Sequence, residues 1–367
     1  MPKAIIIFED DWELWGNGLG NVAHLQYLPL LYLIGLANKF EIKINFMVEV
    51  LQQLAFIKYS SGNRNLSIQS NLWDECIILM KENGHDVQLH LHPQWYNCTY
   101  RDGFFKLNND WNISNYEPND RQSMISSSII YLENLLKKID QNYRVMAFKA
   151  ESWAMQPSQG ILSDIENSGI RIVIAGGRGI RKITNYINID YTDIEQDTLP
   201  YYPDFADICK VSDKKENIIV IPLPYYKSYF NIVIIFLIQY IINKIKYHNK
   251  MFYYINTPPQ FISISPFAEK RSIINKIISL FDDANFDISS LPPSVMKSAF
   301  DQIISRVLNY GLENIPVVLQ SHSKGYFGNY DQITKFIDYI TNRYHNYIKF
   351  MTFTELYPLL SDVTVKG

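Results

Sequence analysis

The stretch GHDVQLHLHPQW (Gly84–Trp95) contains three of the seven histidines of this 367-residue chain. Apolar and polar residues alternate across it, which predicts a β-strand with one apolar and one polar face. His90 and His92 are two residues apart, so both imidazoles point to the same side of that strand. Two neighbouring imidazoles suit a metal site or an acid–base site, although a structural pair of histidines has the same spacing.

Short apolar segments alternate with helix-length segments on both sides of this strand. The other expected strands are AIIIFEDD (4–11), IKINFMVEV (42–50), VMAFKAES (145–152), IRIVIAG (170–176), NIIVIPLP (217–224), IPVVLQSHS (315–323) and IKFMTFTEL (348–356). Helices are expected between them, for example over HLQYLPLLYLIGLANKF (24–40) and RQSMISSSIIYLENLLKKID (121–140). This order predicts an α/β fold with a parallel sheet, open or closed into a barrel.

In such a fold the C-terminal ends of the strands gather at one edge, where active sites form. Charged and histidine side chains follow several of the expected strands: Glu9, Asp10, Asp11, His90, His92, Lys149, Glu151 and His322. Their convergence predicts one shared site. A carboxylate and two neutral imidazoles can hold a divalent metal, while a second carboxylate and another histidine supply the base and the acid of a metal-assisted hydrolysis.

The composition is that of an ordinary globular protein, with 47% hydrophobic residues, 19% charged residues and a net charge of −3. This balance gives no indication of a nucleic-acid partner. The three cysteines are scattered, so we expect neither a disulfide framework nor a zinc ribbon, and a reducing compartment fits best. The beginning of the sequence reads as a strand and not as a secretory signal, which leads us to expect a cytoplasmic protein.

The alternation of strands and helices is interrupted late in the chain. We expect one barrel built from residues 1–223 and 315–367, with an insertion of helices and loops over 224–314. The insertion contains the apolar segment Tyr229–Lys246, whose uninterrupted apolar part is shorter than the roughly 20 residues of a membrane-spanning helix. A buried helix is expected there; the alternative is an interfacial helix that makes peripheral membrane contact and brings the enzyme to a lipid-linked sugar.

Four segments, FEDDW (8–12), GHDVQLHLH (84–92), FKAESW (148–153) and SHSK (321–324), resemble in order and place the motifs of the polysaccharide deacetylase family, carbohydrate esterase family 4 with the NodB homology domain. The likeness covers most of the chain apart from the insertion and is closest to the capsule- or lipopolysaccharide-associated branch. It implies a distorted (β/α)7 barrel. It also implies a metal-dependent hydrolase that removes an acetyl or related acyl group from a sugar of a bacterial surface polysaccharide or its precursor.

By this resemblance Asp10 is the catalytic base, and Asp11 is a ligand of a divalent metal that is zinc, cobalt or nickel. Glu9 is an alternative base, because on a regular strand Glu9 and Asp11 share a face and Asp10 does not. His322 matches the late histidine of the family, which acts as the general acid. Lys149 stands where the family often has an arginine that orients the base.

The resemblance also assigns ligands and substrate contacts. His90 matches the first metal-binding histidine of the family. The second family histidine comes four residues later, where this chain has Gln94, so His92 is taken as the second ligand. Trp95 and Trp153 would be walls that stack on the sugar, with an aromatic core position as the alternative for each.

The departure at Gln94 supports a second hypothesis, a carbohydrate-binding barrel that has lost catalysis. The acids and histidines retained at the other motif positions speak against it. A carbohydrate is the expected partner under both hypotheses. Metal content and acetate release distinguish the two.

Overall fold

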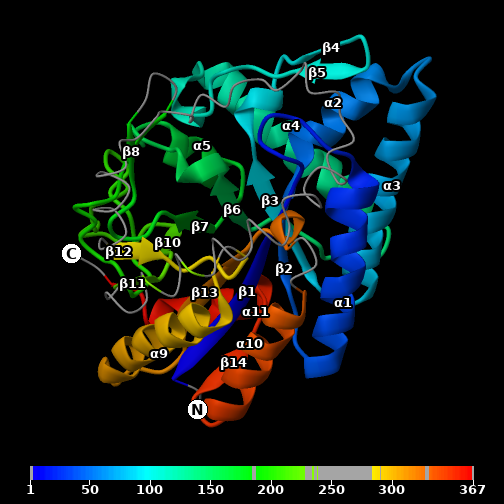
Figure 1. The fold of residues 1–367 in the computed structure, drawn as a ribbon. Helices are drawn as coiled ribbons and strands as arrows, with labels where there is room; N and C mark the ends of the chain where they lie inside the picture. Colours follow the sequence, from blue (N-terminus) through cyan, green and yellow to red (C-terminus); the bar gives the residue numbers. More distant parts are fainter. Residues whose placement is uncertain are drawn as a thin grey trace.

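The computed structural model describes residues 3–183, 187–227, 234, 238, 283–289, 291–326 and 330–365. Its centre is a sheet of parallel strands in the order β10–β7–β6–β3–β2–β1–β13, with β14 paired to the beginning of β1 (Figure 1). The strands are β1 (Ala4–Trp12), β2 (Asn45–Glu49), β3 (Asp86–Leu91), β6 (Ala147–Ala150), β7 (Ile172–Ala175), β10 (Ile219–Pro222), β13 (Ile315–Ser321) and β14 (Ile348–Phe350). This parallel order confirms the predicted α/β fold, a barrel left open between β10 and β13.

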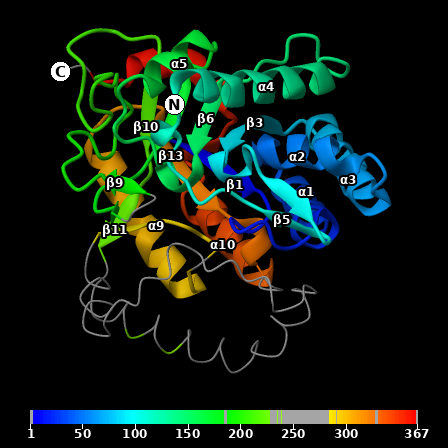
Figure 2. The same cartoon turned by 90° about the horizontal axis from the view of Figure 1, so that it is seen from above.

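Helices surround the sheet, as the view from above shows (Figure 2). They are α1 (Leu28–Phe40), α2 (Val50–Ser60), α3 (Arg64–Glu82), α4 (Pro118–Leu136), α5 (Ile161–Asn167), α9 (Pro293–Asn309), α10 (Tyr330–Arg343) and α11 (Phe353–Leu356). A π-helical segment (Ala23–Tyr27) precedes α1, and short 3-10 turns lie at Pro93–Trp95, Ile113–Asn115, Glu151–Trp153, Ser323–Gly325 and Tyr357–Asp362. Three antiparallel strand pairs complete the fold: β4 (Thr99–Arg101) with β5 (Phe104–Lys106), β8 (Arg181–Ile183) with β9 (Asn188–Asp190), and β11 (Tyr225–Lys227) with β12 (Asp283–Asn285).

The two faces of β1 pack against different layers. Ala4, Ile6 and Phe8 belong to the large apolar core shared with the surrounding helices, whereas Ile5 and Ile7 belong to a smaller core on the inner face. Successive side chains of a strand point to opposite faces. The inner face of β1 is therefore apolar over its first half and continues with the acidic residues at the odd-numbered positions.

The same change from apolar to polar occurs on the neighbouring strands. On β3 the apolar residues Val87, Leu89 and Leu91 lie in the helix-side core, which leaves His90 and His92 on the inner face. Side chains of several strands thus converge above the small inner core, at the C-terminal ends of the strands. This arrangement gathers the site predicted from the sequence.

The described part of residues 224–314 lies against the open edge of the barrel. Phe286 donates a backbone hydrogen bond to Pro224 O (3.1 Å), and Ile288 donates one to Gln320 O of β13 (2.9 Å). The segment after β12 therefore connects the chain just after β10 with the end of β13. The helix expected over Tyr229–Lys246 lies outside the described residues, apart from two isoleucines. Among the helices that the structure describes, none is long and apolar enough to cross a membrane.

Candidate functional site

Three acidic side chains follow one another on the inner face of β1 and the residue just beyond it. Glu9, Asp11 and Glu13 are 0%, 2% and 5% exposed. They occupy alternate positions of an extended chain, so their carboxylates share one face. Buried carboxylates require compensating positive charge or hydrogen bonds. The residues that provide this compensation define the site.

His90 of β3 and His92, the residue just beyond that strand, face these acids. Nε2 of His90 lies 2.9 Å from Nε2 of His92, and both rings are buried. Nδ1 of His90 lies 2.9 Å from Lys149 O, and the ring donates this hydrogen bond because a carbonyl oxygen only accepts. That hydrogen bond leaves Nε2 directed at the acids. A metal-binding histidine is commonly held by a carbonyl in this way.

Glu13 and Glu151 complete a compact group with the two histidines. The four residues each offer one ligand atom, and these atoms lie within 4.8 Å of one another. Glu13 Oε2 is 3.2 Å from His90 Nε2 and also contacts His92 Nε2, while Glu151 Oε2 is 2.5 Å from His92 Nε2. Asp11 stands outside this group, with Oδ1 4.0 Å from His90 Nε2.

The donor set fits a divalent cation. Imidazole nitrogens and carboxylate oxygens are the ligands that zinc and related metals take in proteins. Among the described residues, Asp11 Oδ1 is a buried oxygen without a hydrogen-bond partner, and Glu13 Oε2 has only the two imidazoles as partners. Burial lowers the pKa of His92, but Glu13 and Glu151 outweigh burial and raise that pKa well above its usual value. The pocket between the acids therefore favours positive charge.

Lys149 forms ion pairs with Glu9 and Asp11, the first two acids on the inner face of β1. Its Nζ donates to Glu9 Oε1 (2.8 Å) and to Asp11 Oδ2 (2.7 Å), and the lysine is 1% exposed. Burial raises the pKa of Asp11, but Lys149 and His90 outweigh burial and hold that pKa well below its usual value. Burial and the charge of Asp11 raise the pKa of Glu9 well above its usual value. The pKa values of the pair therefore move apart, with Asp11 favouring the ionised form and Glu9 the protonated form.

His322 stands between two aspartates. Its Nε2 lies 3.1 Å from Asp11 Oδ2, and its Nδ1 lies 2.9 Å from Asp287 Oδ2. Burial lowers the pKa of His322, but Asp287 and Asp11 outweigh it and raise the pKa well above the usual value. The imidazole is therefore protonated and in hydrogen-bond contact with an ionised carboxylate.

Asp10 occupies the other face of β1, which revises its predicted role. Its Oδ1 accepts hydrogen bonds from Ser321 Oγ (2.7 Å) and Ser323 N (2.8 Å), and its Oδ2 accepts one from Ser323 Oγ (2.8 Å). Both oxygens are thus used to hold the turn after β13. The structure places Asp11, and not Asp10, beside the histidines, because strand alternation separates the two aspartates.

Lys324 is a second buried lysine, and it contacts Glu13, the third acid on this face. Lys324 Nζ contacts Glu13 Oε1 and donates to Leu14 O (3.0 Å). Because Lys324 takes one carboxylate oxygen of Glu13, the other oxygen is left facing His90 and His92. Burial raises the pKa of Glu13, but His92 and Lys324 outweigh burial and lower it well below its usual value. Glu13 is therefore ionised.

The two predicted sugar walls have different surroundings. Trp95 is 3% exposed and packs against Phe56 and Phe105, with ring centroids 6.1 and 5.2 Å away. Trp95 is therefore a core residue, which is the alternative that the sequence left open for it. Trp153 is half-buried, and Lys149 Nζ lies 5.9 Å from its ring centroid. The structure therefore brings Trp153 to the site.

Gln94, at the position of the missing family histidine, supports His92. Its Nε2 lies 3.1 Å from His92 Nδ1 and 3.3 Å from Gly16 O, and the side chain is fully buried. His85 lies apart, against Phe46 in the core, and burial lowers its pKa to about 4. The structure thus gives Gln94 a place next to a site histidine.

Glu13, Asp287 and Lys324 were not predicted as site residues from the sequence, whereas Glu151 was named among the strand-end residues without a role of its own. A signal existed for Glu13, which continues the alternate acids of β1. Lys324 lies two positions after His322, but across a turn, where alternation no longer predicts direction. Asp287 follows β12 and carries no local pattern at all.

Comparison with known proteins bears on the fold. No family model matches the sequence, and no curated protein sequence matches it. A crystal structure assigned to the polysaccharide deacetylases, from Mycobacterium smegmatis, is similar with a TM-score of 0.53 and 10% identity over 100% of this chain and 93% of that chain. PuuE allantoinase is also similar, with a TM-score of 0.47 and 12% identity over 97% of this chain and 89% of that chain. A structure assigned as a polysaccharide deacetylase from Pseudomonas aeruginosa PAO1 has a TM-score of 0.46 and 12% identity over 97% of this chain and 90% of that chain.

The likeness to the Mycobacterium smegmatis structure extends over both chains almost completely. At 10% identity it establishes the fold and leaves the chemistry to the residues of this chain. The parallel order of the strands and the position of the four sequence motifs at their C-terminal ends agree with it. The chain therefore has the NodB-like fold of the polysaccharide deacetylases.

Proposed function

We propose that the protein is a metal-dependent hydrolase that removes an acetyl or related acyl group from a carbohydrate. The observation that carries the proposal is the contact between the two halves of the site. Asp11 Oδ2 touches His322 Nε2 at 3.1 Å, while Asp11 Oδ1 is 4.0 Å from His90 of the four-residue group. A base, an acid and a candidate metal centre thus lie within contact of one another.

Glu13, His90, His92 and Glu151 would hold the metal. A divalent metal bound by these residues would polarise the acyl carbonyl and lower the pKa of a water molecule. The four side chains are fixed by partners of their own: Lys149 O for His90, Gln94 for His92, Lys324 for Glu13 and Ser152 Oγ for Glu151 (2.8 Å). Such supporting contacts keep ligands in one orientation.

Asp11 is assigned the role of the base in place of Asp10. It is ionised, buried and on the inner face, and Lys149 fixes one of its oxygens at 2.7 Å. Its other oxygen is free of hydrogen bonds among the described residues and faces the histidines. A carboxylate in this position can take a proton from an attacking water molecule.

His322 is assigned the role of the general acid. Its side chain is 28% exposed, more than the side chains of His90, His92 and the acids that these three histidines contact. Its protonated state is maintained by Asp287 and Asp11. A proton given to the departing oxygen or nitrogen of the sugar would leave His322 neutral, between two carboxylates that favour its reprotonation.

The finer identity of the substrate follows from the sequence resemblance alone. The family likeness of the four motifs supports a sugar of a bacterial surface polysaccharide or its precursor, and Trp153 is a half-buried aromatic side chain beside Lys149. A carbohydrate-binding protein without catalysis is the second hypothesis. The absence of a histidine at Gln94 is the observation that favours it.

The deciding experiment combines elemental analysis of the purified protein with an assay of acetate release from acetylated oligosaccharides. We expect about one metal ion per chain, lost in His90→Ala and Glu13→Gln and kept in Asp11→Asn. Acetate release should be lost in all three variants. A chain that binds no metal after loading with zinc, cobalt or nickel, and that releases no acetate, would leave the carbohydrate-binding hypothesis.

A further inference from the structure

Glu13 and His92 both lie just beyond the end of a strand. The pairing of β1 with β2 ends at Trp12 and Val48, and β3 ends at Leu91. The hydrogen bonds of the sheet therefore do not fix the direction of either residue. Both belong to the four-residue group that is the candidate metal centre. The contacts that hold their backbones come from the beginning of α2.

Glu49 ties the backbone of His92 to the beginning of α2. Its Oε2 accepts a hydrogen bond from His92 N, and its Oε1 accepts from Leu51 N (2.6 Å) and Gln52 N (3.2 Å). The side chain is fully buried and is the N-cap of α2. A helix N-terminus has unpaired N–H groups, which a capping carboxylate satisfies. One oxygen of Glu49 is thus fixed by the helix, and the other holds His92.

Gln52, in the same turn of α2, holds the residue that follows Glu13. Its Oε1 accepts from Leu14 N (3.3 Å), and its Nε2 donates to Gln26 Oε1 (2.9 Å). Gln52 is fully buried, and both ends of its amide have a partner. The backbone on the C-terminal side of Glu13 is therefore tied to α2.

Gln26 holds the residue that precedes Glu13. Its Nε2 donates to Trp12 O (3.4 Å), and its backbone oxygen accepts from Trp12 Nε1 (3.1 Å). Gln26 is fully buried and belongs to the π-helical segment before α1. Such segments are rare and occur frequently at functional sites. Because Gln26 is in turn held by Gln52, the backbone on both sides of Glu13 depends on one chain of amides.

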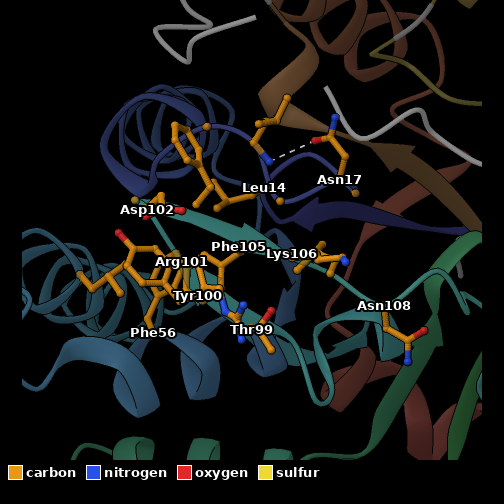
Figure 3. Close-up of a pocket in the computed structure, with 18 of the residues that line it drawn as sticks. Leu14, Asn17, Phe56, Thr99, Tyr100, Arg101, Asp102, Phe105, Lys106 and Asn108 are labelled. Carbon is orange, nitrogen blue, oxygen red and sulfur yellow. Dashed lines mark hydrogen bonds between the residues drawn. The ribbon is translucent and has the colours of Figure 1, made fainter. Parts of the chain in front are cut away.

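The loop that begins after Glu13 has open space beside it. Residues between Leu14 and Gly20 line a hollow of about 700 Å³, together with Phe56 of α2 and the β4–β5 hairpin (Figure 3). Among the described residues, packing therefore supports only part of the surface of this loop. The hydrogen bond from Leu14 N to Gln52 is then a main determinant of the direction in which the chain leaves β1.

We infer that Glu49, Gln52 and Gln26 are positioning residues that set the geometry of the four-residue group through the backbones of Glu13 and His92. The inference rests on the proposed function for the identity of this group as a metal site. The three residues contribute no ligand atom to the group. They determine where its ligand atoms point, so a chain that keeps all four ligands but loses this support should bind metal weakly.

Gln52→Leu removes both hydrogen bonds of the amide and keeps a side chain of similar size. Gln53→Leu is the matched control, because Gln53 is the next residue of α2, is also fully buried and donates to residues of α3 and α4 instead. Both variants lose buried hydrogen bonds of the same helix, so thermal unfolding should show both to be less stable than wild type. Only Gln52 is connected to the four-residue group.

Glu49→Asp is the second variant and decides the question if Gln52→Leu does not fold. Aspartate is a preferred N-cap residue, so α2 keeps its cap. The side chain is one methylene shorter, so its carboxylate cannot hold both the helix and His92 N. The variant therefore releases His92 with little change to the helix.

Two measurements report on the four-residue group and not on overall stability. The visible spectrum and the affinity of cobalt(II) report how the ligands are arranged around a metal. The nitrogen-15 NMR signals of the histidine rings report the surroundings of His90 and His92 in the metal-free protein. We expect Gln52→Leu and Glu49→Asp to bind cobalt at least about tenfold more weakly, with a changed spectrum and shifted ring signals. Gln53→Leu should match wild type in all three.

The inference is overturned if folded Gln52→Leu and Glu49→Asp bind cobalt as wild type does, with the same spectrum. It is also overturned if Gln53→Leu changes the spectrum and the affinity as much as Gln52→Leu does, because the effect would then follow from loss of stability alone. In either case, wild-type protein that binds metal and releases acetate would leave the hydrolase proposal standing.

Failure of the proposed function has a different signature. If wild-type protein binds no zinc, cobalt or nickel and releases no acetate, the hydrolase proposal fails, and the ring signals of the metal-free protein test the inference. Signals of His92 that shift in Gln52→Leu and Glu49→Asp, but not in Gln53→Leu, would support the positioning role. Identical ring signals in wild type and all variants would overturn it.

Discussion

Asp287 Oδ2 lies 2.9 Å from Nδ1 of His322, although Asp287 follows β12 and His322 follows β13. The segment that carries Asp287 is held to β13 by the hydrogen bond from Ile288 N to Gln320 O. This contact brings a residue from the region between the two parts of the barrel into the site. The acidity of His322 therefore depends on a segment outside the regular strand–helix pattern.

Asp287→Asn should shift the pH dependence of hydrolysis. His322 must be protonated to act as an acid, and Asp287 is the largest influence that raises its pKa. Removal of that carboxylate lowers the pKa of His322, so the decline of kcat/KM on the alkaline side should move to lower pH. A kcat/KM profile between about pH 5 and 10 measures the shift. Asp207→Asn is the control, because Asp207 is distant in the fold and forms a turn; identical profiles for Asp287→Asn and wild type would refute the assignment.

Glu13→Gln and Glu151→Gln should weaken metal binding while the protein stays folded. Each substitution keeps the size of the side chain and removes one negative ligand from the four-residue group. We expect a loss of affinity of at least about tenfold, measured by competition with a chromophoric chelator. Glu195→Gln, at an exposed position, is the control. If Asp11→Asn alone lowers the affinity and both glutamine variants bind normally, the ligand set has been assigned wrongly.

Lys324→Met should weaken metal binding although lysine is not a ligand. Lys324 holds Oε1 of Glu13 and is 8% exposed, so its loss frees the carboxylate to rotate away from the histidines. We expect a reduction in affinity of about tenfold, the effect typical of losing a supporting contact. Lys335→Met on the exposed side of α10 is the control. A cobalt-loaded protein with an unchanged visible spectrum and unchanged affinity would show that Lys324 does not orient Glu13.

Asp10→Asn and Asp11→Asn should have opposite kinds of effect. Asp10 accepts three hydrogen bonds from the turn after β13, so its substitution should mainly lower stability, by about 1–3 kcal/mol for the disturbed buried contacts. Asp11→Asn should abolish activity, because it removes the proposed base. Thermal unfolding and acetate release, measured on the same samples, separate the two. Full activity in Asp11→Asn with none in a folded Asp10→Asn would restore the prediction made from the sequence.

Trp95→Ala should lower the free energy of unfolding more than Trp153→Ala does. Trp95 is buried against two phenylalanines, and removal of a buried tryptophan costs about 3–5 kcal/mol. Trp153 is half-buried beside Lys149, so its substitution should reduce stability less and substrate affinity more. Denaturant unfolding together with KM values tests this difference. Equal loss of stability in both variants would place Trp153 in the core as well.

The sequence by itself determined the parallel α/β fold and the partners His90, His92, Lys149 and His322. Apolar–polar alternation on each strand, together with the rule that strand ends meet at one edge, is sufficient for this. The same alternation already separated Asp10 from Glu9 and Asp11, since positions on one strand face differ by two. Family resemblance pointed to Asp10 as the base, whereas strand geometry places Asp11 beside His90 and His322, which is why we propose Asp11.

Only the tertiary structure decided which acids accompany the histidines and how they are charged. Lys324 lies in a turn and Asp287 follows β12, where no periodicity fixes the direction of a side chain. Trp95 looked like a sugar wall until the packing of Phe56 and Phe105 placed it in the core. The pKa values depend on burial and on contacts between residues that are far apart in the sequence. These are properties of the folded chain, because they arise from distances that sequence spacing does not determine.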